Sequence, residues 1–263
     1  MKLHADKSLG QHFLTNQAII SKIVNSFSNE PRDAWIEVGP GTGALTKHLL
    51  KMNPNLFAIE KDPRFIEHLY PLFKEHQLIY SDALKFNWEN FLKENRLKEK
   101  SIWLVSNLPY NVATPLFMQF LKIPEIKYMT LMMQKEVGEK LHFFPQKKNQ
   151  TSSLLCHAQN FFTTELVTLV SPGSFNPPPK VDSIVLNFTR KESTLIPLNQ
   201  FDHWEKFLRA LFSQKRKQIN HQLKGIIPDE IKRKSILEKC NISPQSRAES
   251  LSLPDIQNLY KTI

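Results

Sequence analysis

The sequence predicts an α/β protein in which an open, mostly parallel sheet carries helices on both faces and a small all-α domain follows. Apolar strand-like runs alternate with helical patterns over about the first 190 residues. A glycine-rich turn joins the first buried-type run to a helix, as in Rossmann-like folds. Beyond about residue 192 the strand patterns stop. We therefore predict two domains, residues 1–192 and residues 193–263.

The expected elements follow from the spacing of the apolar residues. Asn16 is a plausible N-cap for a first helix whose apolar face runs from residue 19 to residue 27. Buried-type strands are expected at 34–38, 55–59, 78–80, 102–105 and 128–133, with helical patterns at 45–50, 65–73, 88–92, 116–121 and 134–141. Two further strands at 161–170 and 181–190 flank a linker, 171–180, that four prolines should keep extended.

The glycine turn is the first candidate binding element. Gly39, Gly41 and Gly43 follow the apolar run 34–38 at alternate positions, with Pro40 between the first two. Glycine lets the backbone turn sharply and approach a ligand closely, so Gly39 and Gly41 are candidate ligand contacts. The third glycine comes one residue earlier than in the dinucleotide fingerprint G-x-G-x-x-G. The spacing therefore favours a smaller ligand such as S-adenosylmethionine over a diphosphate.

Carboxylates end the next two strands. Glu60 lies 21 residues beyond Gly39, where it can accept hydrogen bonds from the hydroxyls of a ribose. Asp82, which precedes Ala83, could accept from the exocyclic amine of an adenine or could equally be a helix N-cap. This pattern indicates a nucleoside ligand.

The fourth strand ends in Asn107-Leu108-Pro109-Tyr110, the candidate catalytic residues. The amine of adenine is a poor nucleophile because its lone pair is delocalised into the ring. Two acceptors, the Asn107 side-chain oxygen and the Leu108 carbonyl, could bind its protons and favour a pyramidal nitrogen. Pro109 would fix the turn, and the ring of Tyr110 would stack on a base taken out of its helix.

Composition limits the class of partner. The chain has 35 Lys and Arg against 25 Asp and Glu, a net charge of +10, which favours an anionic partner. Cys156 and Cys240 lack metal-ligand spacing and are interpreted as reduced packing residues, so no metal is expected. The sequence shows no signal peptide and no apolar run of membrane-spanning length. We expect a cytoplasmic protein.

The C-terminal region concentrates positive charge. Residues 201–263 hold 12 Lys and Arg against 7 Asp and Glu, a difference of +5. An amphipathic helix pattern at 204–212 is followed by Lys215, Arg216 and Lys217. We predict that these three residues contact the phosphates of a nucleic acid, although a solvated helix face is the simpler alternative.

With these residues in view, the chain closely resembles the ribosomal RNA adenine dimethyltransferases of the small subunit, the family behind kasugamycin sensitivity. The likeness runs nearly end to end and includes residues 7–14, 37–43, 60, 82–83, 107–110, 134–137, 175–183, 212–217 and 247–252. It implies a methyltransferase domain at 1–192 and a helical domain that binds RNA or the ribosome at 193–263.

The resemblance also implies roles for particular residues. Composition alone would make residues 7–14 a frayed terminus, whereas in the family the matching segment covers the cofactor. His12 and Leu14 thereby become contacts of S-adenosylmethionine beside Gly39, Gly41, Glu60, Asp82, Ala83 and Asn107, and Phe175 becomes a contact of the target base. The implied reaction is dimethylation of the N6 amine of two adjacent adenosines in a hairpin near the 3′ end of 16S rRNA. It would act on small-subunit (30S) particles as a monomer.

Two departures and three alternatives accompany this interpretation. Residues 145–153 lack the Gly-Arg-Leu-Ser pattern expected there, and Lys215 stands where the family often has Arg. The nearest alternative is the sister family that methylates large-subunit RNA and confers macrolide resistance. A ribosome assembly factor with little turnover is an alternative from another class. A nicotinamide dehydrogenase is the least favoured, because of the early third glycine.

Overall fold

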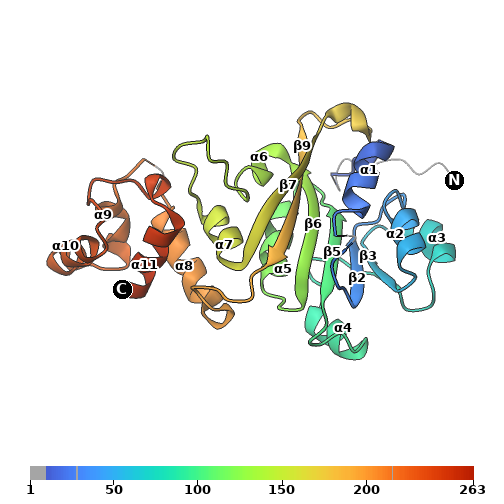
Figure 1. The fold of residues 1–263 in the computed structure, drawn as a ribbon, viewed down its shortest axis with the longest axis horizontal. Helices are drawn as coiled ribbons and strands as arrows, with labels where there is room; N and C mark the ends of the chain where they lie inside the picture. The colour runs from blue at the N-terminus through green and yellow to red at the C-terminus, as the bar shows by residue number, and fades with distance from the viewer. Residues whose placement is uncertain (1–9, 28, 215) are drawn as a thin grey trace. The chain divides into compact units, whose positions relative to one another are not determined.

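A computed structural model describes residues 10–27, 29–214 and 216–263 of the chain (Figure 1). Contacts divide the chain into two units, the first containing residues up to Gly138 and Thr164–Arg190, the second Glu139–Thr163 and Lys191–Ile263. The division departs from the predicted domains in one segment, since residues 139–163 group with the C-terminal helices.

The first unit is built on an open, seven-stranded sheet, which confirms the predicted fold class. The strands follow the order β4-β3-β2-β5-β6-β9-β7. Their bounds are β2 (Ala34–Val38), β3 (Leu56–Glu60), β4 (Leu78–Tyr80), β5 (Ile102–Asn107), β6 (Ile126–Gln134), β7 (Phe162–Val170) and β9 (Ser183–Arg190). The pairs from β4 to β6 are parallel, and β9 joins β6 in the antiparallel sense. A parallel sheet of this kind brings the carboxyl ends of β2, β3 and β5 to one edge.

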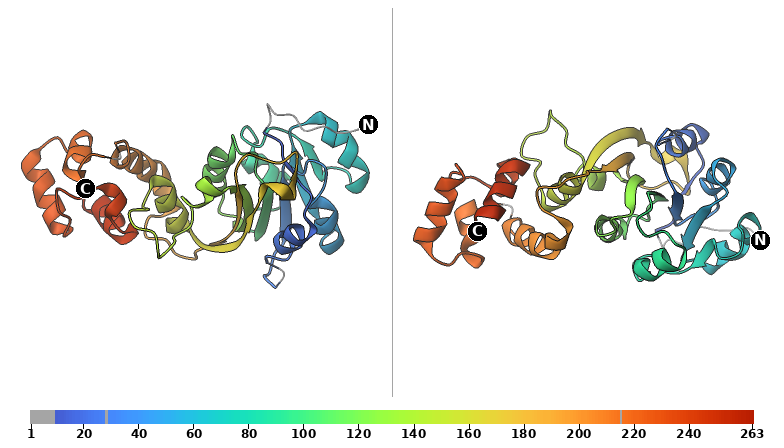
Figure 2. Two further views of the ribbon diagram at one scale, coloured as in Figure 1. Left: turned by 90° about the horizontal axis from the view of Figure 1, so that it is seen from above. Right: turned by 60° about the horizontal axis from the view of Figure 1, so that its bottom comes forward.

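Helices cover both faces of this sheet, which explains why its central strands are almost wholly apolar (Figure 2). On one face, α1 (Gln17–Val24) and α2 (Thr46–Met52) pack on a core that contains Trp35 and Trp103. On the other face, α4 (Trp88–Glu94) and α5 (Ala113–Leu121) bring Phe91 against Phe57 and Phe117 against Phe188, with ring centroids 5.3 Å apart in both pairs. The remaining helices of the first unit are α3 (Pro63–Leu69), η2 (Tyr70–Leu72), α6 (Lys135–Gly138) and η3 (Pro172–Ser174).

The first helix begins as predicted. The side chain of Asn16 accepts hydrogen bonds from the backbone N–H groups of Ala18 and Ile19, at 3.0 and 3.3 Å. These bonds satisfy two of the N–H groups that a helix leaves unpaired at its start. The cap sets where α1 begins and so places residues 10–14 directly before it.

A two-stranded sheet attaches this N-terminal segment to the first unit. Strand β1 (Phe13–Leu14) pairs antiparallel with β8 (Phe175–Asn176). The linker 171–180 is therefore not extended throughout, because η3 turns it and β8 gives it a partner. Composition alone predicted a frayed terminus at 7–14. Residues 10–14 are ordered by this long-range pairing, and residues 7–9 lie outside the described part of the chain.

The second unit is helical. Its elements are α7 (Ser153–Phe161), η4 (Leu198–Gln200), α8 (Phe201–Leu211), α9 (Ile219–Gln222), η5 (Leu223–Gly225), α10 (Glu230–Lys239), η6 (Ala248–Ser250) and α11 (Leu253–Thr262). The predicted amphipathic helix is α8, and its Trp204 packs edge-on against Tyr260 of α11, with ring centroids 5.1 Å apart.

One buried amide explains why residues 139–163 belong to the second unit. Asn160 of α7 donates to the carbonyl of Ile196 and accepts from the N–H of Ile196 and from the side chain of Gln257, at 2.8, 3.2 and 2.8 Å. These bonds join α7 to the segment before α8 and to α11. The sequence interpretation missed α7, because its apolar residues merge with the strand pattern that follows.

Among the described residues, no helix is both long and apolar enough to span a membrane. Likewise, His, Cys, Asp and Glu side chains nowhere gather in threes that could hold a metal ion within the part of the chain described.

Candidate active site

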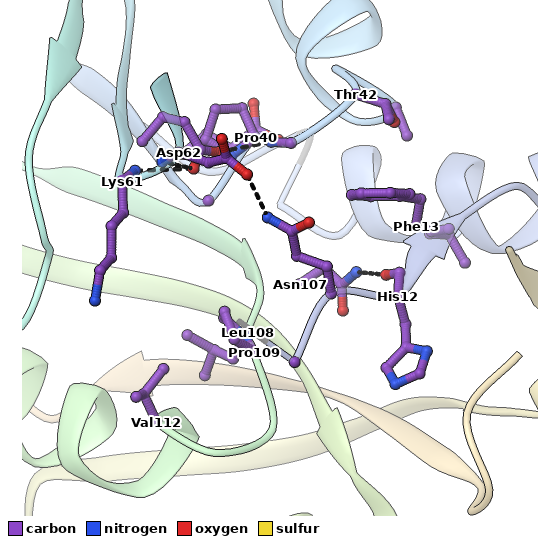
Figure 3. Close-up of a pocket in the computed structure, with 18 of the residues that line it drawn as sticks. His12, Phe13, Pro40, Thr42, Lys61, Asp62, Asn107, Leu108, Pro109 and Val112 are labelled. Atoms are coloured by element: carbon purple, nitrogen blue, oxygen red, sulfur yellow. Dashed lines mark hydrogen bonds between the residues drawn. The ribbon is translucent and has the colours of Figure 1, made fainter. Parts of the chain in front are cut away.

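A pocket opens at the edge of the sheet where the parallel strands end (Figure 3). Ligand sites of open α/β sheets lie at this edge, because loops from several strands converge there. The lining residues come from the N-terminal segment, the glycine turn and the ends of β3, β4 and β5: residues 10–14, 37, 39–42, 44–45, 60–62, 82 and 107–112. The pocket thus brings together all but one of the predicted cofactor residues and all four predicted catalytic residues. The exception, Ala83, is nearly buried and is not among the lining residues.

The glycine turn requires glycine because of its backbone torsion angles and, at one position, because a side chain would not fit. Gly39, Gly41 and Gly43 have φ angles of +70°, +55° and +79°, in the left-handed region that disfavours other residues. A Cβ at Gly43 would lie 2.9 Å from Leu69, whereas a Cβ at Gly39 would meet nothing within 4 Å. Gly43 therefore serves the packing of the turn, and Gly39 leaves open space in the pocket.

Glu60 holds two loops together at the pocket wall. Its Oε2 accepts from the N–H of Gly41 at 2.9 Å, and its Oε1 accepts from the N–H groups of Lys61 and Asp62, both at 2.8 Å. Burial raises the pKa of Glu60 against the opposing effect of these donors. A carboxylate has about four acceptor sites, so Oε2 keeps one for a ligand hydroxyl. The predicted ribose role is compatible with this geometry.

Glu37 is a pocket residue that the sequence interpretation missed. It is the next-to-last residue of β2, is 2% exposed, and accepts a hydrogen bond from the Thr46 hydroxyl at 2.7 Å. Burial raises its pKa to about 8, and the charge of nearby Glu60 acts in the same direction. The sequence feature that could have identified Glu37 is its position as the single acidic residue in the apolar run 34–38.

Asp62 fastens the N-terminal segment to the pocket and was also missed. The Gln11 amide donates to its Oδ2 at 2.9 Å, and the Arg64 guanidinium pairs with both of its oxygens. The hydrogen bond from Arg64 is the main reason that the pKa of Asp62 falls to about 2. Residues 10–14 are therefore tied to the loop after β3 as well as to β8.

Asp82 caps a turn and also lines the pocket. Its Oδ1 accepts from the N–H of Leu84 at 3.0 Å, as a turn-capping carboxylate does, and it also lines the pocket. The Lys61 ammonium lies 2.8 Å from its Oδ2, and this hydrogen bond is the main reason that the pKa of Asp82 is lowered. No helix follows Asp82 directly, because α4 begins at Trp88 with Asn87 as its N-cap, and acceptance from an adenine amine stays a prediction.

The amide of Asn107 has a defined orientation. Its Nδ2 donates to the backbone carbonyl of His12 at 3.0 Å, so Oδ1 stays available as an acceptor at the pocket (Figure 3). A carbonyl can only accept, which fixes the nitrogen of the amide on that side. The N–H of Leu108 bonds to the carbonyl of Met132 at 3.0 Å and holds the next residue against β6.

Tyr110 is held by two side chains. Its hydroxyl lies 2.6 Å from the Ser183 hydroxyl, and its ring stacks on the His12 imidazole with centroids 5.4 Å apart and planes 30° apart. The Nδ1 of His12 lies 2.9 Å from the Pro177 carbonyl, which places the proton on Nδ1. His12 thus contacts both the Asn and the Tyr of the candidate catalytic turn.

The residues predicted to contact RNA differ from one another in exposure. Phe175 is 4% exposed, packs in the core beside Leu14 and is not among the lining residues of the pocket, so its contact with the target base stays a prediction. Leu14 is buried as well and lines the pocket. Arg216 and Lys217 are exposed between α8 and α9, and Lys215 lies outside the described residues.

The charge of the pocket decides between ligand classes. Its described lining contains four acidic residues, Glu37, Glu60, Asp62 and Asp82, against one lysine, Lys61, which pairs with Asp82. Glu37 keeps its proton near neutral pH because its pKa is about 8, and Asp62 is paired with Arg64, so Glu60 supplies the negative charge that no cation of the lining offsets. Such a wall repels a diphosphate and favours a ligand that carries positive charge. Together with the glycine turn and the Asn-Leu-Pro-Tyr turn, it defines a Rossmann-like methyltransferase.

Comparison with known proteins places the chain more closely. Residues 2–263 match the model of the family described as ribosomal RNA adenine dimethylase. Ribosomal RNA small subunit methyltransferase A of a Sulfurihydrogenibium species is 36% identical over 267 residues, which cover 100% of this chain and 97% of that protein. The protein of the same name from Malacoplasma penetrans is 36% identical over 95% of this chain and 89% of its own length. The chain therefore belongs to the ribosomal RNA adenine dimethylase family, which confirms the resemblance seen in the sequence.

Solved structures show the same fold. A dimethyladenosine transferase from Plasmodium falciparum superimposes with a TM-score of 0.78 at 27% identity, covering 94% of this chain and 96% of that one. The 23S rRNA methyltransferase ErmE superimposes with a TM-score of 0.71 at 21% identity, covering 95% of this chain and 98% of its own. At that identity the second likeness concerns the fold alone.

Proposed function

We propose that this protein transfers methyl groups from S-adenosylmethionine to the N6 amines of two adjacent adenosines in a hairpin near the 3′ end of 16S rRNA. The observation that carries the proposal is the fixed amide of Asn107, whose free acceptor oxygen borders an acid-lined nucleoside pocket. Family membership and the names of the relatives, which specify the small subunit, support the choice of RNA. Small-subunit (30S) particles are the proposed substrate, and the protein would act on them in the cytoplasm as a monomer.

The cofactor end of the pocket fits S-adenosylmethionine. Gly39 and Gly41 would lie against it, Glu60 would accept from a ribose hydroxyl, and Asp82 would accept from the adenine amine. His12 and Leu14 would cover it, since both line the pocket from the segment that Asp62 and β8 hold in place. When bound, this cofactor supplies a methyl group on a positively charged sulfur. The surrounding carboxylates favour that charge.

The base end of the pocket fits an adenine amine. Asn107 Oδ1 and the Leu108 carbonyl would each accept one N–H of the amine, which favours the pyramidal nitrogen needed for attack. Neither acceptor has to reorganise, because the Nδ2 of Asn107 is bonded to His12 and the N–H of Leu108 is bonded to β6. Pro109 stiffens the turn, and Tyr110 presents an aromatic ring for stacking.

The second unit is the proposed RNA-binding element. Arg216 and Lys217 are exposed, and with Lys215 they would contact phosphates of the ribosomal RNA. Such contacts position an RNA without reading its sequence. Specificity for the two adenosines would then depend on the shape of the RNA and on the pocket.

The direct test is methyl transfer with purified protein and labelled S-adenosylmethionine. Unmethylated small-subunit and large-subunit particles are offered separately, and the digested RNA is analysed by mass spectrometry. The expected product is N6,N6-dimethyladenosine at two adjacent positions of 16S rRNA. Label in 23S rRNA would replace the proposal with the large-subunit alternative. Particle binding without transfer would indicate an assembly factor.

A further inference from the structure

Tyr110 lies in a turn, where the local backbone does not restrict the orientation of its ring. It follows Pro109 in the turn between β5 and α5, outside any helix or strand. A tyrosine ring in such a turn can rotate about two side-chain torsions unless other groups hold it. Stacking on a base requires one fixed plane, so the contacts that fix the ring matter for the chemistry.

The first contact comes from a rigid part of the sheet. Ser183 is the first residue of β9, is fully buried, and pairs in register with Gln134 of β6. Its hydroxyl lies 2.6 Å from the hydroxyl of Tyr110. The ordinary pKa of a tyrosine is 10 and burial raises that of Tyr110 further, so the phenol is protonated near neutral pH and either hydroxyl can donate. A hydrogen bond this short, to an atom on a strand, fixes the far end of the ring.

The second contact fixes the tilt of the ring. His12 stacks on Tyr110 with centroids 5.4 Å apart, and its own ring is held by the bond between Nδ1 and the Pro177 carbonyl. Pro177 and Ser183 belong to the same segment, which runs from β8 into β9. This segment therefore holds Tyr110 at two points, directly through Ser183 and indirectly through His12.

We propose that Ser183 is a positioning residue for methyl transfer: its hydroxyl holds the Tyr110 ring in the plane on which the target adenine stacks. The proposal rests on the proposed function, because it assumes that Tyr110 receives the base. Stacking by itself requires only the ring of Tyr110, whereas the bond to Ser183 makes the hydroxyl necessary to aim that ring.

The experiment compares Ser183→Ala, Tyr110→Phe and the double variant in single-turnover methyl transfer onto unmethylated small-subunit particles at saturating S-adenosylmethionine. Each single change removes the same hydrogen bond from one side. We expect each to lower the rate by about three- to tenfold, the range for one neutral hydrogen bond. The double variant should be no slower than the slower single variant, because either change alone already removes that hydrogen bond. Affinity for S-adenosylmethionine, measured by calorimetry, should stay at the wild-type value.

Thr130→Val is the matched control. Thr130 is also a fully buried hydroxyl of the sheet, bonded to Trp103 and Asn187 within the core. Its replacement should lower thermal stability and leave the single-turnover rate of folded protein unchanged. A fall in rate in Thr130→Val equal to that in Ser183→Ala would overturn the proposal, because general loosening of the sheet would then explain both.

The remaining outcomes are distinct. Wild-type rates in both single variants, or fully multiplicative effects in the double variant, would overturn the positioning role while the wild type still methylates 16S rRNA. If the wild type itself transfers no methyl group to adenosine, the proposed function fails instead. Should Ser183→Ala not fold, Tyr110→Phe removes the same bond at a half-buried position, and its rate alone supports or overturns the role.

Discussion

The pocket residues are held largely by backbone groups and by each other. Glu60 accepts hydrogen bonds from three backbone N–H groups, and Asp62 accepts them from a guanidinium and an amide. Asn107 donates a hydrogen bond from Nδ2 to a backbone carbonyl. A buried polar group that loses its hydrogen-bond partner destabilises the folded protein, so each of these groups restricts the positions of the groups that it binds. Substitutions at single residues should therefore give distinct and separable effects.

Glu37 should make stability depend on pH. Its folded-state pKa is about 8 against an ordinary value of 4.5. Between these values the unfolded chain has released the proton and the folded chain keeps it, so rising pH favours unfolding, by at most about 1.4 kcal/mol per pH unit. Glu37→Gln keeps an acceptor for Thr46 and cannot ionise. Its thermal midpoint relative to wild type should therefore rise steadily from pH 5 to pH 8, as followed by circular dichroism. A difference that does not change with pH would show that Glu37 ionises normally.

Asn107 should affect turnover more than binding. Asn107→Ala removes an acceptor that is needed most as the amine becomes pyramidal, and removal of one such group commonly costs on the order of a hundredfold in rate. Single-turnover methyl transfer should fall by about that factor, while calorimetry shows S-adenosylmethionine still bound. A wild-type rate in the folded variant would exclude the proposed role of the amide.

Asn107→Asp separates the two roles of the side chain, in which Oδ1 is the proposed acceptor and Nδ2 donates to the His12 carbonyl. The aspartate offers acceptors but cannot donate to the His12 carbonyl, which lies 3.0 Å from the present Nδ2. Repulsion between the two oxygens should loosen residues 10–14. We expect low activity together with faster amide hydrogen exchange in that segment. Unchanged exchange would mean that the bond to His12 contributes little.

At the scale of elements, the glycine turn and the β1–β8 sheet shape the pocket. The turn supplies a backbone that bends three times through the left-handed region, and the small sheet holds residues 10–14 at the pocket wall. Neither element is long enough to be stable alone. Both depend on contacts with the rest of the first unit, including the packing of Gly43 beside Leu69 of α3 and the hydrogen bond from Gln11 to Asp62, the N-cap of α3.

Two glycines of the turn should respond differently to the same change. Gly43→Ala combines a φ of +79° with a Cβ 2.9 Å from Leu69, so it should destabilise the fold by more than the roughly 1–2 kcal/mol of a left-handed alanine. Gly39→Ala incurs only the backbone cost, since no atom lies within 4 Å of its Cβ. Its methyl group would enter the pocket and weaken cofactor affinity. Urea unfolding and calorimetry measure the two effects. Equal decreases in stability would contradict the packing role of Gly43.

At the scale of the whole molecule, charge is distributed unevenly. The pocket of the first unit is lined by carboxylates, whereas residues 201–263 carry 12 Lys and Arg against 7 Asp and Glu. A protein with this distribution can hold a cationic cofactor in one place and a polyanion in another. The two functions can then be changed independently.

Neutralising the basic cluster should weaken RNA binding alone. Changing Lys215, Arg216 and Lys217 to Gln should reduce the salt dependence of particle binding, by a slope of about 0.7–0.9 for each phosphate that the variant no longer neutralises. Affinity for S-adenosylmethionine should not change. Binding is measured from about 50 to 200 mM salt on small-subunit particles, the range over which phosphate contacts alter affinity most visibly. If the salt dependence of binding has the same slope for wild type and variant, the cluster is a solvated helix face that does not contact phosphates.

The sequence alone determined most of the sheet and most of the pocket edge. Strands β2, β3 and β5, the cap at Asn16 and helix α8 were predictable, because each depends on the spacing of nearby residues. Glu60, Asp82 and Asn107 were identified because the ends of parallel strands meet at one edge whatever the details of packing. These features require only local pattern and a general rule of topology.

Tertiary structure decided which side chains hold those residues in place. The partners His12–Asn107, Tyr110–Ser183 and Gln11–Asp62 are separated by 95, 73 and 51 residues. Tertiary structure also buried Phe175 in the core and joined residues 139–163 to the C-terminal helices through Asn160. No local pattern encodes such pairs, because each forms only when packing brings distant segments within hydrogen-bonding distance.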